Sequence, residues 1–413
     1  MDRRTLLKIG GMGVLGLGVG GCFSKIGPTV GEITRINPSL YGLVPVDASW
    51  DRVIRTTVGL RPFRRSGFVV KAERFDEKTL IHNYGHGGAG MSLSWGTGFL
   101  AAEMALEQES RIAAVIGSGV AGLTTGRQLQ RMGFDVTIYA MNVPPNTTSN
   151  MSLASFTPTS GLIGIGGRTP QWDIQFRRAV DISYNQLQLL VGYKYGISWI
   201  NSYSMMDEIP SAMMDGMPSA EASQNTGRLL PESYRPSRIL LQPGEHPFPS
   251  LYATSRPSMR IEPSIYLDAL MNDFQISGGH IVIRKFDTPE DIATLKEQTV
   301  VNCTGLGAKT LFGDEELTPV KGQLTVMVPQ PEVNYATFGG IPSREREADE
   351  FSIHMYPRSD GIILGGTSER GESSLEPNEE AMHRIVDSHI AFFDEWKRRN
   401  CGFGPYGSAG CLT

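Results

Sequence analysis

The sequence predicts an α/β protein of two domains, one built on a parallel sheet and one on a mostly antiparallel sheet. Its 413 residues, 40% of them hydrophobic and 20% charged, are enough for two substantial cores. A strand, a glycine turn, a helix and a second strand are expected in order over 112–139, and an alternating strand pair over 351–366. A formal net charge of -5 without a long basic run argues against nucleic acid as the main partner.

The first 22 residues have the character of a targeting segment. Arg3, Arg4 and Lys8 precede an apolar, glycine-rich run over 9–19. The arginine pair followed by this run resembles the twin-arginine export signal, which directs proteins to a pathway that transports them already folded. A membrane-spanning helix is the weaker alternative, because the run is short and rich in glycine. We therefore expect export to the periplasm.

Cys22 closes this segment in a sequence that resembles a lipoprotein processing box. Two outcomes stay open: Cys22 becomes the lipidated first residue of a membrane-anchored protein, or cleavage nearby discards it. Residues 23–46 contain recurring prolines and are expected to form a tether. In the C-terminal tail over 401–413, Cys401 and Cys411 flank a turn-rich segment, and they either pair in an oxidising compartment or stay free.

The strongest local signal lies over 112–139. A β-branched apolar run over 112–116 leads into the pattern G-x-G-x-x-G over 117–122 and then into a helical pattern that ends near Gly133. Residues 134–139 follow as a second strand. Such glycines let the backbone approach a pyrophosphate, whose charge faces the helix N-terminus. The segment predicts a Rossmann-type dinucleotide site, with a tight packing turn as the alternative.

One element of the dinucleotide pattern is missing at the end of the second strand. The neutral residues 140–142 stand where an acidic residue would hold the ribose, so ribose contacts must come from elsewhere. Asn142 or the polar cluster over 146–150 can supply partners, although turn formation also explains that composition. The cofactor-binding residues expected here are Gly117, Gly119, Val120, Ala121, Gly122, Asn142, Thr147, Thr148 and Ser149.

Two segments before residue 111 resemble the signature of the D-amino-acid oxidase family. They are V-G-L-R-P-F-R over 58–64 and I-H-N-Y-G-H-G-G-A-G over 81–90, the latter followed by S-W-G over 94–96. N-C-T-G-L-G-A over 302–308 and V-K-G-Q over 320–323 are similar to two further family segments, so the resemblance covers roughly residues 47–400. It implies an FAD-dependent oxidoreductase, and we expect its FAD to be noncovalent because Cys303 looks buried in a strand.

The order of these segments differs from that of the family. There the arginine and H-N-Y-G-H-G-G segments close the chain, whereas here they precede the dinucleotide strand. We therefore expect a circularly permuted chain, joined near 106–110 and with new ends near Asp47 and Asn400. A tandem fusion of incomplete domains is the alternative. The predicted FAD-binding domain comprises 47–160 and 263–322, and the substrate domain comprises 161–262 and 323–400.

The resemblance also implies roles for particular residues. Arg61 would bind the substrate carboxylate, a task that suits the guanidinium fork. The Gly88 carbonyl would accept from the substrate amine, and the helix that starts near Ser92 would point its N-terminus at the flavin. Thr304 and Gly305 match positions close to the cofactor, with a plain turn as the alternative. The loop expected along the flavin consists of Gly87, Gly88, Ala89, Gly90, Met91 and Ser92.

Three histidines need separate interpretations. His354 stands where the family has a tyrosine that contacts the substrate carboxylate, and strand alternation places Tyr356 on the same face. His354 and Tyr356 are therefore candidate substrate-contacting residues, although His354 packed against the sheet is an equal alternative. The segment 345–350, which matches a mobile lid of the family, is strongly acidic. No metal site is expected at His82 and His86, which should instead form hydrogen bonds that stabilise their loop.

The implied reaction is oxidation of an amino acid, with a D-amino acid favoured by the family. Hydride would pass from the α-carbon to flavin N5, and the imino acid would hydrolyse to a keto acid and ammonia. Oxygen as acceptor would give hydrogen peroxide. Two alternatives remain: a periplasmic dehydrogenase of glycine-like or proline-like secondary amines that passes electrons to a membrane acceptor, and a flavin-binding protein without turnover.

Overall fold

The computed structural model describes residues 42–153, 155–161, 167–209, 229–230, 234, 237–339 and 351–399. The targeting segment, most of the tether, the acidic segment 345–350, Cys401 and Cys411 lie outside these residues. Within the described ranges, none of the helices combines the length and the apolar character needed to cross a bilayer.

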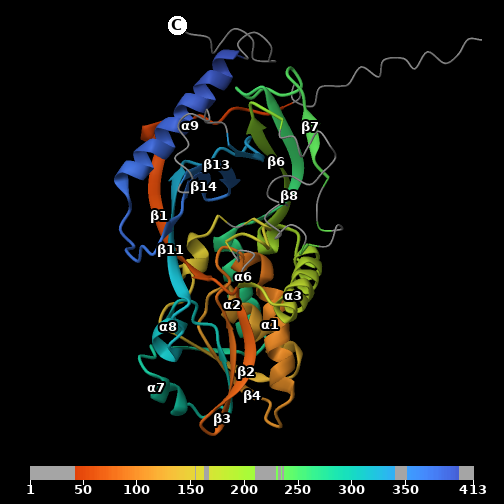
Figure 1. The fold of residues 1–413 in the computed structure, drawn as a ribbon, viewed down its shortest axis with the longest axis vertical. Helices are drawn as coiled ribbons and strands as arrows, with labels where there is room; N and C mark the ends of the chain where they lie inside the picture. The colour runs from red at the N-terminus through yellow and green to blue at the C-terminus, as the bar shows by residue number, and fades with distance from the viewer. Residues whose placement is uncertain are drawn as a thin grey trace, which may run out of the picture. The chain divides into compact units, whose positions relative to one another are not determined.

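A six-stranded sheet forms one part of the fold (Figure 1). Five of its strands run parallel, and β2 pairs antiparallel with β3 at one edge. The order across the sheet is β2 (Val69–Phe75), β3 (Lys78–Tyr84), β10 (Thr299–Asn302), β4 (Ile112–Ile116), β5 (Asp135–Ala140) and β9 (His280–Ile283).

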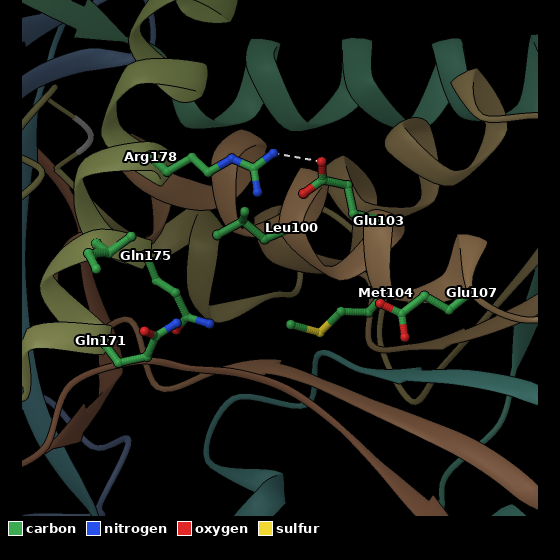
Figure 2. A pocket seen from close by; sticks show the side chains of 8 residues that line it. Leu100, Glu103, Met104, Glu107, Gln171, Gln175 and Arg178 are labelled. Carbon is green, nitrogen blue, oxygen red and sulfur yellow. Dashed lines mark hydrogen bonds and ion pairs between the residues drawn. The ribbon is translucent and has the colours of Figure 1, made fainter.

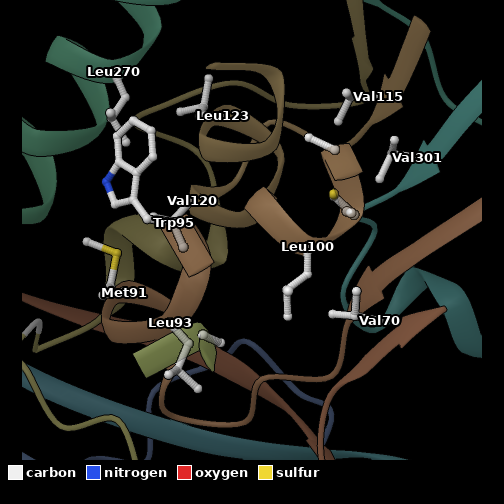
Figure 3. Close-up of a cluster of buried hydrophobic side chains, with 14 of the residues drawn as sticks. Val70, Met91, Leu93, Trp95, Leu100, Val115, Val120, Leu123, Leu270 and Val301 are labelled. Atoms are coloured by element: carbon white, nitrogen blue, oxygen red, sulfur yellow. The ribbon is translucent and has the colours of Figure 1, made fainter. Parts of the chain in front are cut away.

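Helices cover both faces of this sheet, and its central strands β10 and β4 are accordingly buried on both sides. One core joins Val115 and Val301 to α1 (Gly90–Leu106), α2 (Val120–Arg131), α3 (Pro170–Leu189) and α6 (Pro263–Ile276). Figure 3 shows Trp95 of α1 beside Leu123 of α2 and Leu270 of α6. The alternate strand residues, including Ala114 and Ile116, pack on the other face against α7 (Pro289–Ala293) and α8 (Gly307–Phe312).

A nine-stranded sheet forms the second part, and α9 (Glu379–Arg399) packs on one of its faces. Among its described strands, the neighbours are antiparallel except β12 and β6, which are parallel. The order is β1 (Val53–Arg64), β11 (Leu317–Met327), β14 (Gly361–Thr367), β13 (Phe351–Arg358), β12 (Tyr335–Phe338), β6 (Ile197–Met206), β8 (Tyr252–Ile261) and β7 (Ile239–Leu241), and β15 (Glu369–Arg370) pairs with β11. Single 3-10 turns occur at Trp50–Arg52, Thr148–Met151 and Tyr193–Tyr195.

The α/β class and the local elements agree with the prediction. The strand predicted over 112–116 has those bounds, and Gly133, at φ +85°, follows the end of α2 as the expected C-cap glycine. The second strand runs one residue later than predicted, over Asp135–Ala140. The alternating pair over 351–366 forms β13 and β14, which are antiparallel.

Two elements lie in a different part of the fold from the one predicted. β1 was expected in the FAD-binding domain but pairs with β11 in the nine-stranded sheet. α3 lies in the range 161–262 predicted for the substrate domain, but it ends at Leu189, before Gly192 at φ +139°, and packs against α1. The reason is close helix packing: a Cβ on Gly96 would lie 2.0 Å from the carbonyl oxygen of Ala179.

Candidate cofactor and substrate site

Three loops meet at one edge of the six-stranded sheet. β10 lies between β3 and β4 and runs parallel to both, so the carboxyl ends of the three strands share this edge. The loops that follow are 85–89 after β3, 117–119 after β4 and 303–306 after β10. The Cys303 amide donates to the Ile116 carbonyl at 2.9 Å, which joins two of the loops directly.

The turn after β4 and the first turn of α2 each contain one position that admits only glycine. Gly117 has φ +106°, and a Cβ there would lie 2.6 Å from the Cys303 carbonyl oxygen. A Cβ on Gly122 would lie 1.9 Å from the Gly117 carbonyl oxygen. α2 begins directly after Gly119, so its first amides face the turn, as in sites that bind phosphate. The residues present therefore fit the pyrophosphate of a dinucleotide.

The polar residues predicted to bind the cofactor after β5 lie beside this turn. The Val120 amide donates to Ser149 Oγ at 3.0 Å, so the Ser149 hydroxyl lies at the N-terminus of α2. Thr147 donates to Asn150 within its own turn at 2.7 Å, and Thr148 opens the 3-10 turn. Asn142 is exposed, and its backbone carbonyl accepts from the Ser118 hydroxyl at 2.5 Å.

The loop before α1 is held from two sides. The Gly87 amide donates to the Pro62 carbonyl at 3.0 Å. A Cβ on Gly88 would lie 2.9 Å from Ser160 Oγ, so the chain passes close to the segment 157–161. Ser92, which is buried, accepts from the Thr157 amide at 2.8 Å. α1 starts at Gly90, two residues before the predicted start, and Ala89 precedes it as the N-cap.

His82 and His86 make the hydrogen bonds that were expected of them. His86 Nε2 lies 2.9 Å from the Thr97 hydroxyl, and burial lowers the pKa of His86 to about 4. His82 contacts Asn302 through one ring nitrogen and Glu73 through the other. Within the described residues, no group of three or more His, Cys, Asp or Glu side chains is placed to hold a metal ion. Cys303 is buried and unpaired, and burial raises the pKa of its thiol to about 12.

Arg61 lies on β1 and extends across the neighbouring strand. A Cβ on Gly322 of β11 would lie 2.5 Å from Arg61 Nη2, so the guanidinium lies flat against a strand that has no side chain at this point. Arg61 Nη1 donates to the Thr367 carbonyl at 3.4 Å. Burial lowers the pKa of Arg61, and among the described residues no carboxylate forms an ion pair with it. A largely buried cation of this kind favours an anionic ligand.

His354 and Tyr356 share one face of β13, as alternation predicts. Phe338 packs on the apolar cluster that contains Tyr356, and the ring centroids of Phe338 and His354 are 5.9 Å apart. The His354 ring lies over β14, where a Cβ on Gly365 would be 2.1 Å from His354 Nε2. Tyr356 is fully buried, and this burial raises the pKa of its hydroxyl. The substrate contact expected of Tyr356 stays a prediction.

Two positions in this site were not singled out from the sequence. Pro62 links the Arg61 strand to the loop before α1, and its ring also lies 4.0 Å from a Cβ placed on Gly305. Gly322 belongs to the V-K-G-Q segment but had no assigned role. A glycine in a strand is a signal of close approach, and it could have indicated Gly322.

A separate groove lies between α1 and α3 (Figure 2). It is crossed by an ion pair between Arg178 and Glu103 at 2.6 Å. On the α1 side its residues run from Leu100 to Glu107, the C-cap, at the end of the helix away from Gly90. This groove is therefore not part of the site at the sheet edge.

Comparison with known proteins identifies the family. The sequence profile described as FAD dependent oxidoreductase matches residues 2–104 and 113–406. The chain is 25% identical over 284 residues to a D-amino acid oxidase of Dugesia ryukyuensis, covering 66% of this chain and 75% of that protein. It is 24% identical to a D-aspartate oxidase of Homo sapiens, covering 66% and 73% of the two chains.

Among solved structures, the fold is similar to that of glycine oxidase from Geobacillus kaustophilus. The TM-score is 0.50 at 16% identity, and the match covers 69% of this chain and 79% of that one. This likeness concerns the fold alone. Together with the glycine turn that fits a pyrophosphate, the profile match establishes that the chain belongs to the FAD-dependent oxidoreductase family of D-amino-acid oxidase type, with FAD as its cofactor.

Proposed function

We propose that the protein catalyses the oxidative deamination of an amino acid, and that a D-amino acid is the substrate. The observation that carries this proposal is the hydrogen bond from the Gly87 amide to the Pro62 carbonyl at 3.0 Å. It brings the strand that carries Arg61 to the loop that precedes α1. Arg61, which can bind a carboxylate, and the loop before α1, which would lie along the flavin, are therefore next to each other. Relatives named D-amino acid oxidase and D-aspartate oxidase support the same substrate class.

Each part of the site has a task in this proposal. FAD, when bound, supplies the acceptor for hydride from the substrate α-carbon. The amides at the start of α2, with Gly117, Gly119 and Gly122, hold its pyrophosphate, and Ser149 with Asn142 lies beside them. The loop before α1 faces the flavin. Arg61 fixes the substrate carboxylate and the Gly88 carbonyl accepts from the amine, so that two contacts orient the α-carbon.

The substrate is tested by anaerobic bleaching of the bound flavin with a panel of D- and L-amino acids, sarcosine and proline, followed by air. We expect D-amino acids to bleach the flavin, and air to restore its colour with formation of peroxide. Bleaching by sarcosine or proline alone, without reoxidation by air, would favour a secondary-amine dehydrogenase with a membrane acceptor. A flavin that no compound reduces would favour a binding protein without turnover.

The FAD is proposed to be noncovalent, because the Cys303 thiol is buried and protonated at neutral pH. Acid precipitation should release all yellow colour into the supernatant. Colour that stays with the precipitated chain would contradict this.

We further propose that the chain order is circularly permuted. Two observations support it: the family profile matches in two pieces that leave out residues 105–112, and Asp47 lies beside α9, the last described helix. Lys397 on α9 forms an ion pair with Asp47 at 3.3 Å. A variant opened between Leu106 and Arg111, with a short linker joining residues 400 and 47, should fold and retain FAD. Failure of that variant to bind FAD would count against the permutation.

Export by the twin-arginine route, with or without lipidation of Cys22, is proposed on the sequence alone. Replacing Arg3 and Arg4 by lysine keeps the charge but removes both guanidinium groups. FAD-loaded protein should then accumulate in the cytoplasm. Unchanged periplasmic levels would refute the twin-arginine route.

A further inference from the structure

A chain of hydrogen bonds runs from the surface to the loop after β10. Glu73 on β2, whose side chain is 43% exposed, lies 3.0 Å from Nε2 of His82, whose side chain is 2% exposed. His82 Nδ1 lies 3.1 Å from the Asn302 amide nitrogen. Asn302 Oδ1 accepts both from the Thr304 amide at 3.1 Å and from the Thr304 hydroxyl at 2.7 Å.

The backbone fixes the direction of every bond in this chain. The Thr304 amide can only donate, so the atom of Asn302 that faces it is the oxygen. The Asn302 amide nitrogen then donates to His82 Nδ1, which must carry no proton. The proton of the neutral ring therefore resides on Nε2, which donates to Glu73.

This arrangement determines what Thr304 offers to a ligand. Its amide and its hydroxyl proton are both used by Asn302 Oδ1, so only oxygen lone pairs of Thr304 remain. Such a residue accepts from a hydroxyl or an imide N–H, and it does not donate to a phosphate. The ribityl hydroxyls and the imide of the flavin are donors of this class.

We propose that Glu73, His82 and Asn302 are positioning residues that hold Thr304 as a hydrogen-bond acceptor toward FAD, and that neutral His82 is required for this. The inference rests on the proposed function, with Thr304 in the loop 303–306 at the sheet edge that carries the glycine turn. A proton on His82 Nδ1 would face the N–H of Asn302, and turning the Asn302 amide round would instead set its N–H against the Thr304 amide, which can only donate. Protonation of His82 therefore removes one hydrogen bond of this chain in either arrangement, and Thr304 is no longer held as an acceptor.

The groups around His82 give the direction of the pH effect. Burial lowers the pKa of His82, and the hydrogen bond that His82 donates to Glu73 opposes this shift. Lys71 on β2 also lowers the pKa, Asp314 raises it, and the rings of Tyr84 and Phe312 pack against the imidazole. His82 is therefore neutral at pH 8, and FAD affinity should fall as acidification protonates it.

The test measures the dissociation constant of FAD from the full-chain apoprotein between pH 5.5 and 8, with circular dichroism to confirm folding. The wild type should bind FAD progressively more weakly as the pH falls, with a limit of about tenfold once His82 is protonated, as expected for one lost hydrogen bond. His82→Gln can still accept from Asn302 and donate to Glu73 but does not titrate, so its affinity should match the wild type at pH 8 and stay constant. Thr304→Val should bind about tenfold more weakly at both pH values.

Glu73→Gln tests the same network in case the His82 variant does not fold, because Glu73 lies on a partly exposed strand. It removes the charge that favours protonated His82, so the loss of affinity should move to lower pH. A wild-type affinity that does not vary with pH, or an identical pH profile in His82→Gln or Glu73→Gln, would overturn the proposal. No amino acid is present in these measurements, so their outcome is independent of whether any substrate reduces the flavin.

Discussion

The edge of the six-stranded sheet and the strands around Arg61 form their parts of the site by opposite means. At the sheet edge the site is formed by backbone groups, because the glycines at 117 and 122 let carbonyls and amides approach closely. On the nine-stranded sheet the site is formed by side chains. There Gly322 and Gly365 lie on neighbouring strands and leave room for Arg61 and His354. The backbone site depends on residues that are close in sequence, whereas the side-chain site depends on strand register.

This difference predicts unequal consequences of adding a methyl group. A Cβ at Gly117 or Gly122 meets a backbone carbonyl, which cannot move away. A Cβ at Gly322 or Gly365 meets the end of a side chain, which can move but then leaves its functional position.

The largest effect is expected from Gly122→Val, because the new Cβ would lie 1.9 Å from the Gly117 carbonyl oxygen. The turn must open, and the protein should be purified without FAD and with a lower melting temperature. Absorbance at the flavin maximum measures this loss. Gly133→Asn is the control: Gly133 follows the same helix, nothing lies within 4 Å of its Cβ, and asparagine tolerates its positive φ. Full FAD content in Gly122→Val would show that close backbone approach at Gly122 is not needed to bind FAD.

Arg61→Leu should have the second largest effect, and the variant should still bind FAD. Losing the charge-assisted pair leaves a substrate carboxylate desolvated without a partner, which costs roughly 2 to 5 kcal/mol in kcat/KM. Steady-state kinetics on the best substrate of the bleaching panel, with the flavin spectrum as control, measure this. Near-normal kcat/KM in a variant that is still yellow would remove Arg61 from the site.

Gly322→Ala should have a smaller effect on the same step. The added Cβ, 2.5 Å from Arg61 Nη2, displaces the guanidinium while the fold is retained. We expect KM to rise, with a loss of roughly 1.5 to 3 kcal/mol in kcat/KM, the range for a hydrogen bond to a charged group. The control is the double variant: in the Arg61→Leu background the alanine should cost nothing further. Additive losses would show that Gly322 does not act through Arg61.

The smallest expected effect concerns His354→Tyr. An imidazole can change charge between about pH 5 and 8, whereas a phenol cannot. If His354 lines the substrate pocket, the variant should flatten the pH dependence of kcat/KM and shift preference toward neutral D-amino acids. The same substrates should be assayed with His86→Gln, which lies in the loop before α1, to separate the two histidines. An unaltered profile in His354→Tyr would place His354 outside the pocket.

Sequence patterns over a few neighbouring residues predicted the cofactor edge, the edge of the six-stranded sheet that carries the glycine turn. The strand before Gly117, α2 and the Gly133 C-cap follow from neighbouring residues, because each depends on interactions within a few positions. The hydrogen-bonding roles of His82 and His86 were also anticipated.

Features that depend on distant pairing were not predicted. The pairing of β1 with β11 was not predicted, because the two strands are far apart in the sequence and no property of residues 53–64 identifies the partner. The role of Gly322 requires the register that pairs Gly59 with it, which sets Arg61 beside Val320. Asn302 orients Thr304 only because β10 lies beside β3 in a register that pairs Asn302 with His82.

The position of β10 has a further consequence during translation. This strand separates β3 from β4, and its residues leave the ribosome long after both neighbours have been made. Until then the two strands have no shared partner, and their edges are open to incorrect pairing with other chains. Closure of the sheet must wait for contacts between residues as far apart as Thr79 and Thr299, which makes folding slow. The nascent chain therefore acquires its cofactor edge late in synthesis, and earlier fragments should depend on chaperones to stay soluble.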